Sequence, residues 1–272
     1  MNFAANTSVQ DVFTARRLDP MLDPKNVIRE SCDSEEHPNT VSVILALDVT
    51  GSMGSGGMEV AKKINVVMTE LYKEIPDVQF MIMGIGDLAY DNAPIQISQF
   101  ESDIRIAEQL DKVYFEKGGG GNGYESYTAA WYMGLRHTKL DCWKRGKKGI
   151  IITTGDEPLN PYLPMKAHYR GGLAEVTGDN LQGDVETADL YREVTEKFDV
   201  YHLAVDDRST MYGYYAYDIK NSWGKYLDED HLKVVTLDDI APTIIDIVKK
   251  AANSEIATVS EVKVNENGYI SW

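Results

Sequence analysis

Short apolar segments alternate with amphipathic segments along most of this chain, and this alternation limits the fold more than any other feature. Residues 41–47 (VSVILAL), 78–85 (VQFMIMGI) and 149–154 (GIIITT) are apolar almost throughout, as expected of strands buried on both faces. Residues 58–75 instead place apolar side chains on one helical face, namely Val60, Ile64, Val67, Met68 and Leu71. The alternation predicts an α/β fold with a doubly wound, mostly parallel central sheet and helices on both faces.

The remaining segments extend the same series. We expect helices over 104–115, 127–136, 185–198 and 238–251, strands over 200–205 and 232–237, and an antiparallel edge strand over 94–100. These elements predict one domain over residues 40–252. An N-terminal extension, 1–39, precedes it, and a C-terminal tail or further edge strand, 253–272, follows it.

Charge and composition exclude several classes of protein. The 272 residues include 43 acidic and 27 basic side chains, a net charge of −16, which disfavours nucleic-acid binding. The apolar segments are too short to span a bilayer, and residues 1–11 do not have the pattern of a signal peptide. Cys32 and Cys142 are too few for a disulfide framework. We therefore expect a cytoplasmic protein without a membrane or nucleic-acid partner.

The first predicted strand runs directly into a segment rich in oxygen-bearing side chains. In DVTGSM, Asp48, Thr50 and Ser52 alternate with small or apolar residues, and the glycines that follow allow the loop to curl around one point. Ligands bind beyond the carboxyl ends of strands in doubly wound sheets. Oxygen donors without His or Cys suit Mg²⁺ or Mn²⁺ better than zinc.

This segment resembles the D-x-[ST]-x-S signature of the von Willebrand factor A domain, where it forms a metal-ion-dependent adhesion site. The resemblance covers residues 40–252 and implies a Rossmann-like fold of the intracellular bacterial or phage type. It implies Mg²⁺ bound by Asp48, Thr50 and Ser52, with Mn²⁺ or Ca²⁺ as alternatives. A second loop, 118–126 (GGGGNGYES), would add Glu125 or else Thr128. A third, 153–158 (TTGDEP), would add Asp156, directly or through water.

The resemblance also implies a function. In the family, an open position on the metal binds an Asp or Glu carboxylate of a partner protein, without catalysis. A chain of charge −16 repels an acidic ligand unless a cation bridges the two. Intracellular members of the family serve assemblies, so the resemblance implies an AAA+ ATPase or another assembly component as partner.

Two long segments are expected to form loops beside this site, residues 157–184 and 206–218. The second contains a group of aromatic residues with polar tips, a composition typical of binding surfaces: Tyr212, Tyr214, Tyr215 and Tyr217. We expect these tyrosines to contact the partner. The alternative is that they pack as a lid on the domain itself.

Other interpretations of the same residues remain open. Asp48 also resembles the nucleophile of haloacid-dehalogenase-like Mg²⁺-dependent phosphotransferases, although the paired acidic residues of their last loop are not found here. The domain could instead be a structural subunit of a larger particle, with its terminal segments as clasps. Ser52 could simply cap a helix, and Glu125 could be a charge that stabilises a helix N-terminus.

Overall fold

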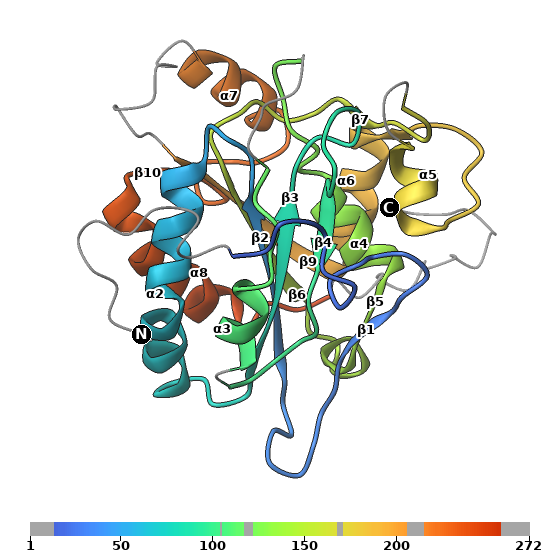
Figure 1. The fold of residues 1–272 in the computed structure, drawn as a ribbon. Helices are drawn as coiled ribbons and strands as arrows, with labels where there is room; N and C mark the ends of the chain where they lie inside the picture. The colour runs from blue at the N-terminus through green and yellow to red at the C-terminus, as the bar shows by residue number, and fades with distance from the viewer. Residues whose placement is uncertain (1–13, 104, 117–121, 168–170, 206–214, 257–272) are drawn as a thin grey trace, which may run out of the picture.

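The central feature of the computed structural model is a six-stranded sheet, described as part of residues 14–103, 105–116, 122–167, 171–205 and 215–256 (Figure 1). Its spatial order is β10 (Leu232–Val235), β9 (Phe198–Val205), β6 (Gly149–Gly155), β2 (Val41–Asp48), β3 (Val78–Ile85) and β4 (Ile95–Ile97). Neighbouring strands are parallel except β3 and the edge strand β4, which are antiparallel. The predicted fold class is confirmed.

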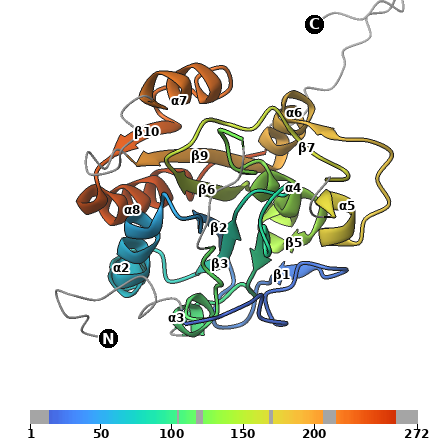
Figure 2. The same cartoon turned by 45° about the horizontal axis from the view of Figure 1, so that its top comes forward.

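Helices cover both faces of this sheet (Figure 2). On one face lie α2 (Gly54–Tyr72), α3 (Arg105–Leu110) and α8 (Ile240–Ala251). On the other lie α4 (Ala129–Arg136), α5 (Gly172–Thr177), α6 (Thr187–Lys197) and α7 (Tyr215–Trp223). None of the helices within the described ranges is both long and apolar enough to span a bilayer.

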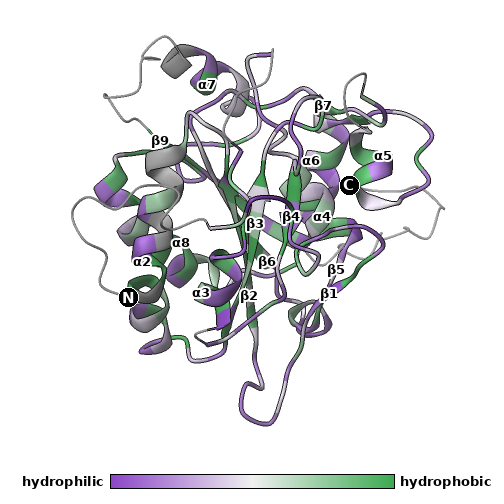
Figure 3. Cartoon of the chain, viewed as in Figure 1, coloured by the Kyte–Doolittle hydropathy of each residue, from purple (hydrophilic) through white to green (hydrophobic). Residues whose placement is uncertain are grey.

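Strand β2 shows why the sequence folds in this way. Its alternate side chains enter two separate hydrophobic cores: Val43, Leu45 and Leu47 pack under α2 and α8, and Ile44 and Ala46 pack under α4. A strand that must bury both faces has no position for an exposed polar residue, and the central strands are accordingly hydrophobic (Figure 3). The polar residues of this part of the chain therefore gather where the strands end.

Several short elements were not predicted from the sequence. Strand β1 (Arg29–Ser31) pairs in parallel with β5 (Thr138–Leu140), and β7 (Tyr162–Leu163) pairs with β8 (Val185–Glu186). Two short helices, η1 (Asp141–Arg145) and η2 (Leu237–Asp239), complete the described elements. Such strands have two or three residues, too few for a recognisable hydrophobic period.

The described part of the N-terminal extension packs onto the domain. Leu22 is buried in the core under α2, and the guanidinium of Arg29 donates to the carbonyls of Met21 and Ile97. At the other end, the backbone N–H of Ile256 donates to the carbonyl of Gly146. Residues 257–272 lie outside the described residues, and the predicted domain boundaries stay a prediction.

Candidate functional site

The predicted first and third loops meet at the carboxyl ends of two neighbouring strands, below α7 in Figure 1. Asp48 is the last residue of β2, and Asp156 directly follows β6. The two strands are paired in parallel register, with Leu47 opposite Thr154. Parallel neighbours end at the same edge of a sheet, and this pairing brings together two carboxylates far apart in the sequence.

Four oxygen atoms from these loops form a continuous chain. The hydroxyl of Thr50 lies 2.6 Å from Oδ1 of Asp48 and 3.3 Å from the hydroxyl of Ser52. The Ser52 hydroxyl donates to Oδ1 of Asp156 at 3.1 Å. The helix cap of α2 is Met53, without a side-chain hydrogen bond, so Ser52 does not cap the helix as the alternative interpretation proposed.

Glu125 of the second loop is buried, with 6% of its surface exposed. Its backbone forms an isolated parallel β-bridge with Leu159, and its side-chain Oε2 has no hydrogen-bond partner among the described residues. Burial, followed by the charges of Asp48, Asp91 and Asp87, raises the pKa of Glu125 to about 11. Helix α4 begins four residues later and has no acidic residue in its first turn, so Glu125 is not a helix-terminus charge.

Thr128, the other second-loop candidate, is hydrogen-bonded to Asn160. Its hydroxyl accepts a hydrogen bond from Nδ2 of Asn160 at 2.6 Å, and its backbone N–H donates to Oδ1 of the same residue at 3.1 Å. Thr128 is fully buried. The geometry thus favours Glu125 over Thr128 as the residue that the second loop directs toward Asp48, although the choice stays a prediction.

The site concentrates negative charge without a counter-charge. Burial, then the charge of Asp156, raises the pKa of Asp48 to about 7. Burial, then Asp156 and Asp48, raises the pKa of Glu157 to about 7. Within the described ranges, no Lys or Arg forms an ion pair with Asp48, Glu125, Asp156 or Glu157. Buried carboxylates of this kind require either protons or a cation.

Carboxylates alone do not complete a metal site here. In the part of the chain that the structure describes, no three His, Cys, Asp or Glu side chains are placed to hold a metal ion by themselves. A cation at Asp48 therefore also depends on the hydroxyls of Thr50 and Ser52. Hydroxyl and carboxylate oxygens together are a hard donor set that suits Mg²⁺.

Sequence reasoning missed Tyr127 and Glu157. The hydroxyl of Tyr127 donates to Oδ2 of Asp48 at 2.6 Å and accepts from the backbone N–H of Glu157 at 3.3 Å. The pattern gave no signal for the first contact, because a tyrosine beside a helix start is expected in the core. Glu157 could have been found, since it directly follows Asp156 in the third loop.

The four predicted partner-binding tyrosines lie in α7 or in the segment just before it in the sequence. Tyr212 and Tyr214 lie outside the described residues, and Tyr215 and Tyr217 fall in α7, where the backbone alone is described. The prediction of a loop up to residue 218 was wrong, because α7 begins at Tyr215. The expected loop over 157–184 was also wrong in part, since it contains β7 and α5.

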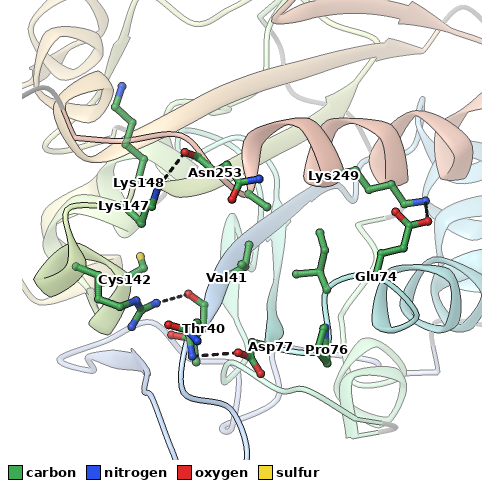
Figure 4. A pocket seen from close by; sticks show the side chains of 14 residues that line it. Thr40, Val41, Glu74, Pro76, Asp77, Cys142, Lys147, Lys148, Lys249 and Asn253 are labelled. Atoms are coloured by element: carbon green, nitrogen blue, oxygen red, sulfur yellow. Dashed lines mark hydrogen bonds and ion pairs between the residues drawn. The ribbon is translucent and has the colours of Figure 1, made fainter.

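A cavity of about 560 Å³ lies at the opposite end of the sheet, near the start of β2 (Figure 4). Its basic side chains are all paired: Arg145 with Asp33, Lys147 with Glu255, Lys148 with Asp199 and Lys249 with Glu74. Figure 4 shows Lys249 turned toward Glu74. This cavity therefore offers an anion little uncompensated positive charge.

Comparison with known proteins shows the fold. No protein-family model and no curated protein matches the chain. Among solved structures, the pilus adhesin SpaC from Lactobacillus rhamnosus GG, in its open conformation, aligns over 84% of this chain with a TM-score of 0.55 and 12% identity. A second crystal form of SpaC gives a TM-score of 0.53, also at 12% identity and 84% coverage. The alignments cover 31% and 32% of SpaC, so this chain spans about a third of that protein.

A further similarity is to the vWF domain of the type V pili tip protein Mfa5 from Porphyromonas gingivalis. It covers 80% of this chain and 98% of the Mfa5 domain, at 9% identity and a TM-score of 0.49. At these identities, the comparisons establish a shared α/β fold with SpaC. Function must be inferred from the site itself.

Proposed function

We propose that this chain is a non-enzymatic, Mg²⁺-dependent protein-binding module. The observation that carries the proposal is the chain of oxygens from Asp48 through Thr50 and Ser52 to Asp156, set among buried carboxylates without a basic partner in the described residues. The unpartnered Oε2 of Glu125 supports it further. A divalent cation would supply the missing counter-charge.

The spacing of these oxygens fits the proposal. Neighbouring ligand oxygens of an octahedral Mg²⁺ lie about 2.9 Å apart, because each bond is about 2.0–2.1 Å long. The three successive separations here are 2.6, 3.3 and 3.1 Å. Small shifts of the Thr50 and Ser52 hydroxyls would bring all of them to that value. Asp48, Thr50 and Ser52 would hold the ion, with Asp156 and Glu125 nearby.

The bound ion would supply positive charge with an exchangeable ligand position, which a partner carboxylate can occupy. The chain itself carries a charge of −16, so an acidic partner is otherwise repelled. The ligand we propose for this position is therefore an Asp or Glu carboxylate of a partner protein. An intracellular assembly component, such as an AAA+ ATPase, remains the partner class proposed from the sequence. SpaC, which shares the fold, is a pilus adhesin.

The phosphotransferase alternative has less support. An aspartyl nucleophile needs an oxygen that can reach the substrate. Both carboxylate oxygens of Asp48 accept hydrogen bonds, from Thr50 and Tyr127, and the residue is fully buried.

The test is thermal unfolding of the full chain with Mg²⁺, Mn²⁺, Ca²⁺ or EDTA, for the wild type and Asp48→Asn. At 100 times its dissociation constant, a ligand stabilises the folded state by about 2.7 kcal/mol. We expect the wild type to melt at a higher temperature with Mg²⁺, and Asp48→Asn to show no such rise. Asp179→Asn is the matched control, because Asp179 also accepts a tyrosine hydroxyl but lies outside the site.

Binding to a partner is tested next, with an immobilised Asp-containing peptide library in Mg²⁺ and in EDTA. Retention of peptides in Mg²⁺ alone supports the proposal. A wild type that melts at the same temperature with every ion and with EDTA contradicts it.

A further inference from the structure

Tyr127 is held in place through both its ring and its hydroxyl. The residue is fully buried, and its ring packs against His202 and Trp223 with centroid separations of 5.4 and 5.5 Å. Its hydroxyl donates to Oδ2 of Asp48 and accepts from the N–H of Glu157. Both polar functions of the hydroxyl are therefore used at the candidate site.

The approach of this hydroxyl depends on a glycine. A Cβ atom at Gly155 would lie 2.1 Å from the Tyr127 hydroxyl oxygen, far inside van der Waals contact. Gly155 is the last residue of β6 and immediately precedes Asp156. The third loop thus leaves room for the Tyr127 hydroxyl next to Asp48.

This contact makes the two oxygens of Asp48 unequal. Oδ2 is occupied by Tyr127 at 2.6 Å. Oδ1 faces Thr50, accepting from its N–H at 2.9 Å and its hydroxyl at 2.6 Å. The Thr50 hydroxyl can turn its proton toward Ser52 when a cation arrives. The Tyr127 hydroxyl prefers its proton in the ring plane and accepts from the N–H of Glu157, so its proton stays on Oδ2 of Asp48. Only Oδ1 continues the chain of oxygens toward Ser52 and Asp156.

From this geometry we infer that Tyr127 is a positioning residue that sets the ion preference of the site, restricting Asp48 to one oxygen and so favouring Mg²⁺ over Ca²⁺. The inference rests on the proposed metal-binding function. Mg²⁺ requires a near-octahedral shell with short bonds, which single carboxylate oxygens provide. Ca²⁺ takes six to eight oxygens at longer distances and gains from carboxylates that bind through both oxygens.

The test is isothermal titration of the full-length protein with Mg²⁺ and, separately, with Ca²⁺. Wild type is compared with Tyr127→Phe, which keeps the ring but frees Oδ2 of Asp48. Loss of a group that orients a metal ligand typically weakens binding by about 10- to 100-fold. We expect Tyr127→Phe to bind Mg²⁺ about tenfold more weakly and to bind Ca²⁺ no more weakly than the wild type. The ratio of the Ca²⁺ Kd to the Mg²⁺ Kd should then fall by about tenfold.

Two further variants keep the test decisive. Tyr132→Phe removes another tyrosine hydroxyl that donates to an aspartate, Asp179, outside the site, and it should leave the ratio unchanged. Gly155→Ala keeps the Tyr127 side chain, but its Cβ would lie 2.1 Å from the hydroxyl oxygen and 2.4 and 2.5 Å from two ring carbons. The tyrosine must therefore shift away from Asp48, and the ratio should move in the same direction as in Tyr127→Phe. Tyr127→Phe removes one oxygen atom and is the milder change, so it supplies the measurement if Gly155→Ala does not fold.

The outcomes separate this inference from the function on which it rests. A wild type that binds Mg²⁺, with variants that weaken both ions equally or neither, overturns the role of Tyr127 and leaves the metal site intact. A wild type that binds neither ion overturns the proposed function and this inference together. A fall in the ratio confined to Tyr127→Phe and Gly155→Ala supports the inference.

Discussion

Among the described residues, charged side chains are paired at one end of the central sheet and unpaired at the other. At the amino ends of the strands, each basic residue around the cavity has a carboxylate partner, such as Arg145 with Asp33 and Lys249 with Glu74. At the carboxyl ends, Asp48 interacts electrostatically with Asp156 and, separately, with Glu125, and none of the three has a basic partner among the described residues. In the described structure, the charges at the amino end are paired, and the carboxylates at the carboxyl end are not.

The pKa values of the acidic residues differ in the same way. Burial alone would raise the pKa of Asp33, but hydrogen bonds from Thr40 and the guanidinium of Arg145 lower it. Burial and neighbouring carboxylates raise the pKa of Asp48 instead. Paired charges of the first kind hold a fold together, whereas clustered like charges reduce stability unless a ligand compensates them. The carboxyl end of the sheet therefore has the charge pattern expected of a functional site.

The largest predicted effect is a pH dependence of the metal-free protein. The pKa of Asp48 is about 7 when folded and about 3.9 when unfolded. At a pH between these two values, Asp48 is protonated in the folded state and ionised in the unfolded chain. The stability of the folded state therefore falls as pH rises through this range. We expect the free energy of unfolding of Asp48→Asn, relative to that of the wild type, to rise by about 2–3 kcal/mol from pH 5 to pH 8. Urea unfolding in EDTA measures this difference.

This comparison between variant and wild type also removes a competing contribution. Burial lowers the pKa of His202 to about 3, so this histidine costs stability as pH falls below its unfolded value of about 6.5. Both proteins contain His202, and its effect cancels in the difference. Saturating Mg²⁺ should stabilise the wild type relative to Asp48→Asn at pH 8, because the ion binds the ionised carboxylate of Asp48. A difference that stays constant from pH 5 to 8 would contradict the prediction.

The second prediction decides between the two second-loop candidates. Glu125, with a pKa of about 11, is protonated at pH 7 without metal, so Glu125→Gln should change metal-free stability by less than about 1 kcal/mol. It should weaken Mg²⁺ binding by about tenfold or more. Thr128→Val should do the opposite: lose about 1–2 kcal/mol, because one N–H of Asn160 is left without Thr128, with unchanged Mg²⁺ affinity.

Titration calorimetry and urea unfolding of both variants check this pair of effects. A large loss of Mg²⁺ affinity in Thr128→Val, with none in Glu125→Gln, would assign the second-loop position to Thr128.

The sequence predicted the main architecture because that architecture depends on local periodicity. Continuous apolar runs marked β2, β3 and β6, and the observed bounds Val78–Ile85 are those predicted. The pairs β1 with β5 and β7 with β8 were missed, because strands of two or three residues are stabilised by tertiary contacts. Helix α7 was missed because its segment has mixed polarity and four tyrosines just before or within it.

The candidate site was predictable to the extent that its residues are close in the sequence. Asp48, Thr50 and Ser52 share one loop, so their spacing alone indicates that they meet. The contact between Tyr127 and Asp48 joins residues 79 positions apart and depends on the absence of a side chain at Gly155. No local pattern carries that information. The lack of a basic partner for the carboxylates likewise appears only when the fold is assembled.

The third prediction concerns the ion pairs at the amino ends of the strands. The planar guanidinium of Arg145 donates both to Asp33 and to the carbonyl of Thr40. The single ammonium group of a lysine does not reproduce this fork of two donors. Arg145→Lys should lose about 1 kcal/mol of stability at pH 7, measured by urea unfolding. Its Mg²⁺ response should equal that of the wild type, because the pair lies at the far end of the strands. Altered Mg²⁺ affinity in this variant would show that the two ends are coupled.

The smallest predicted effect is that of Lys249→Ala. Lys249 of α8 pairs with Glu74 after α2, and both side chains are partly exposed, at 33% and 60%. Ion pairs of this kind contribute about 0–1 kcal/mol, since water and salt screen them. Urea unfolding should therefore show a loss below about 0.5 kcal/mol, which 0.5 M salt abolishes. A larger, salt-resistant loss would mean that α2 and α8 depend on this pair, and that pairing at the amino end fixes the helices that frame the opposite site.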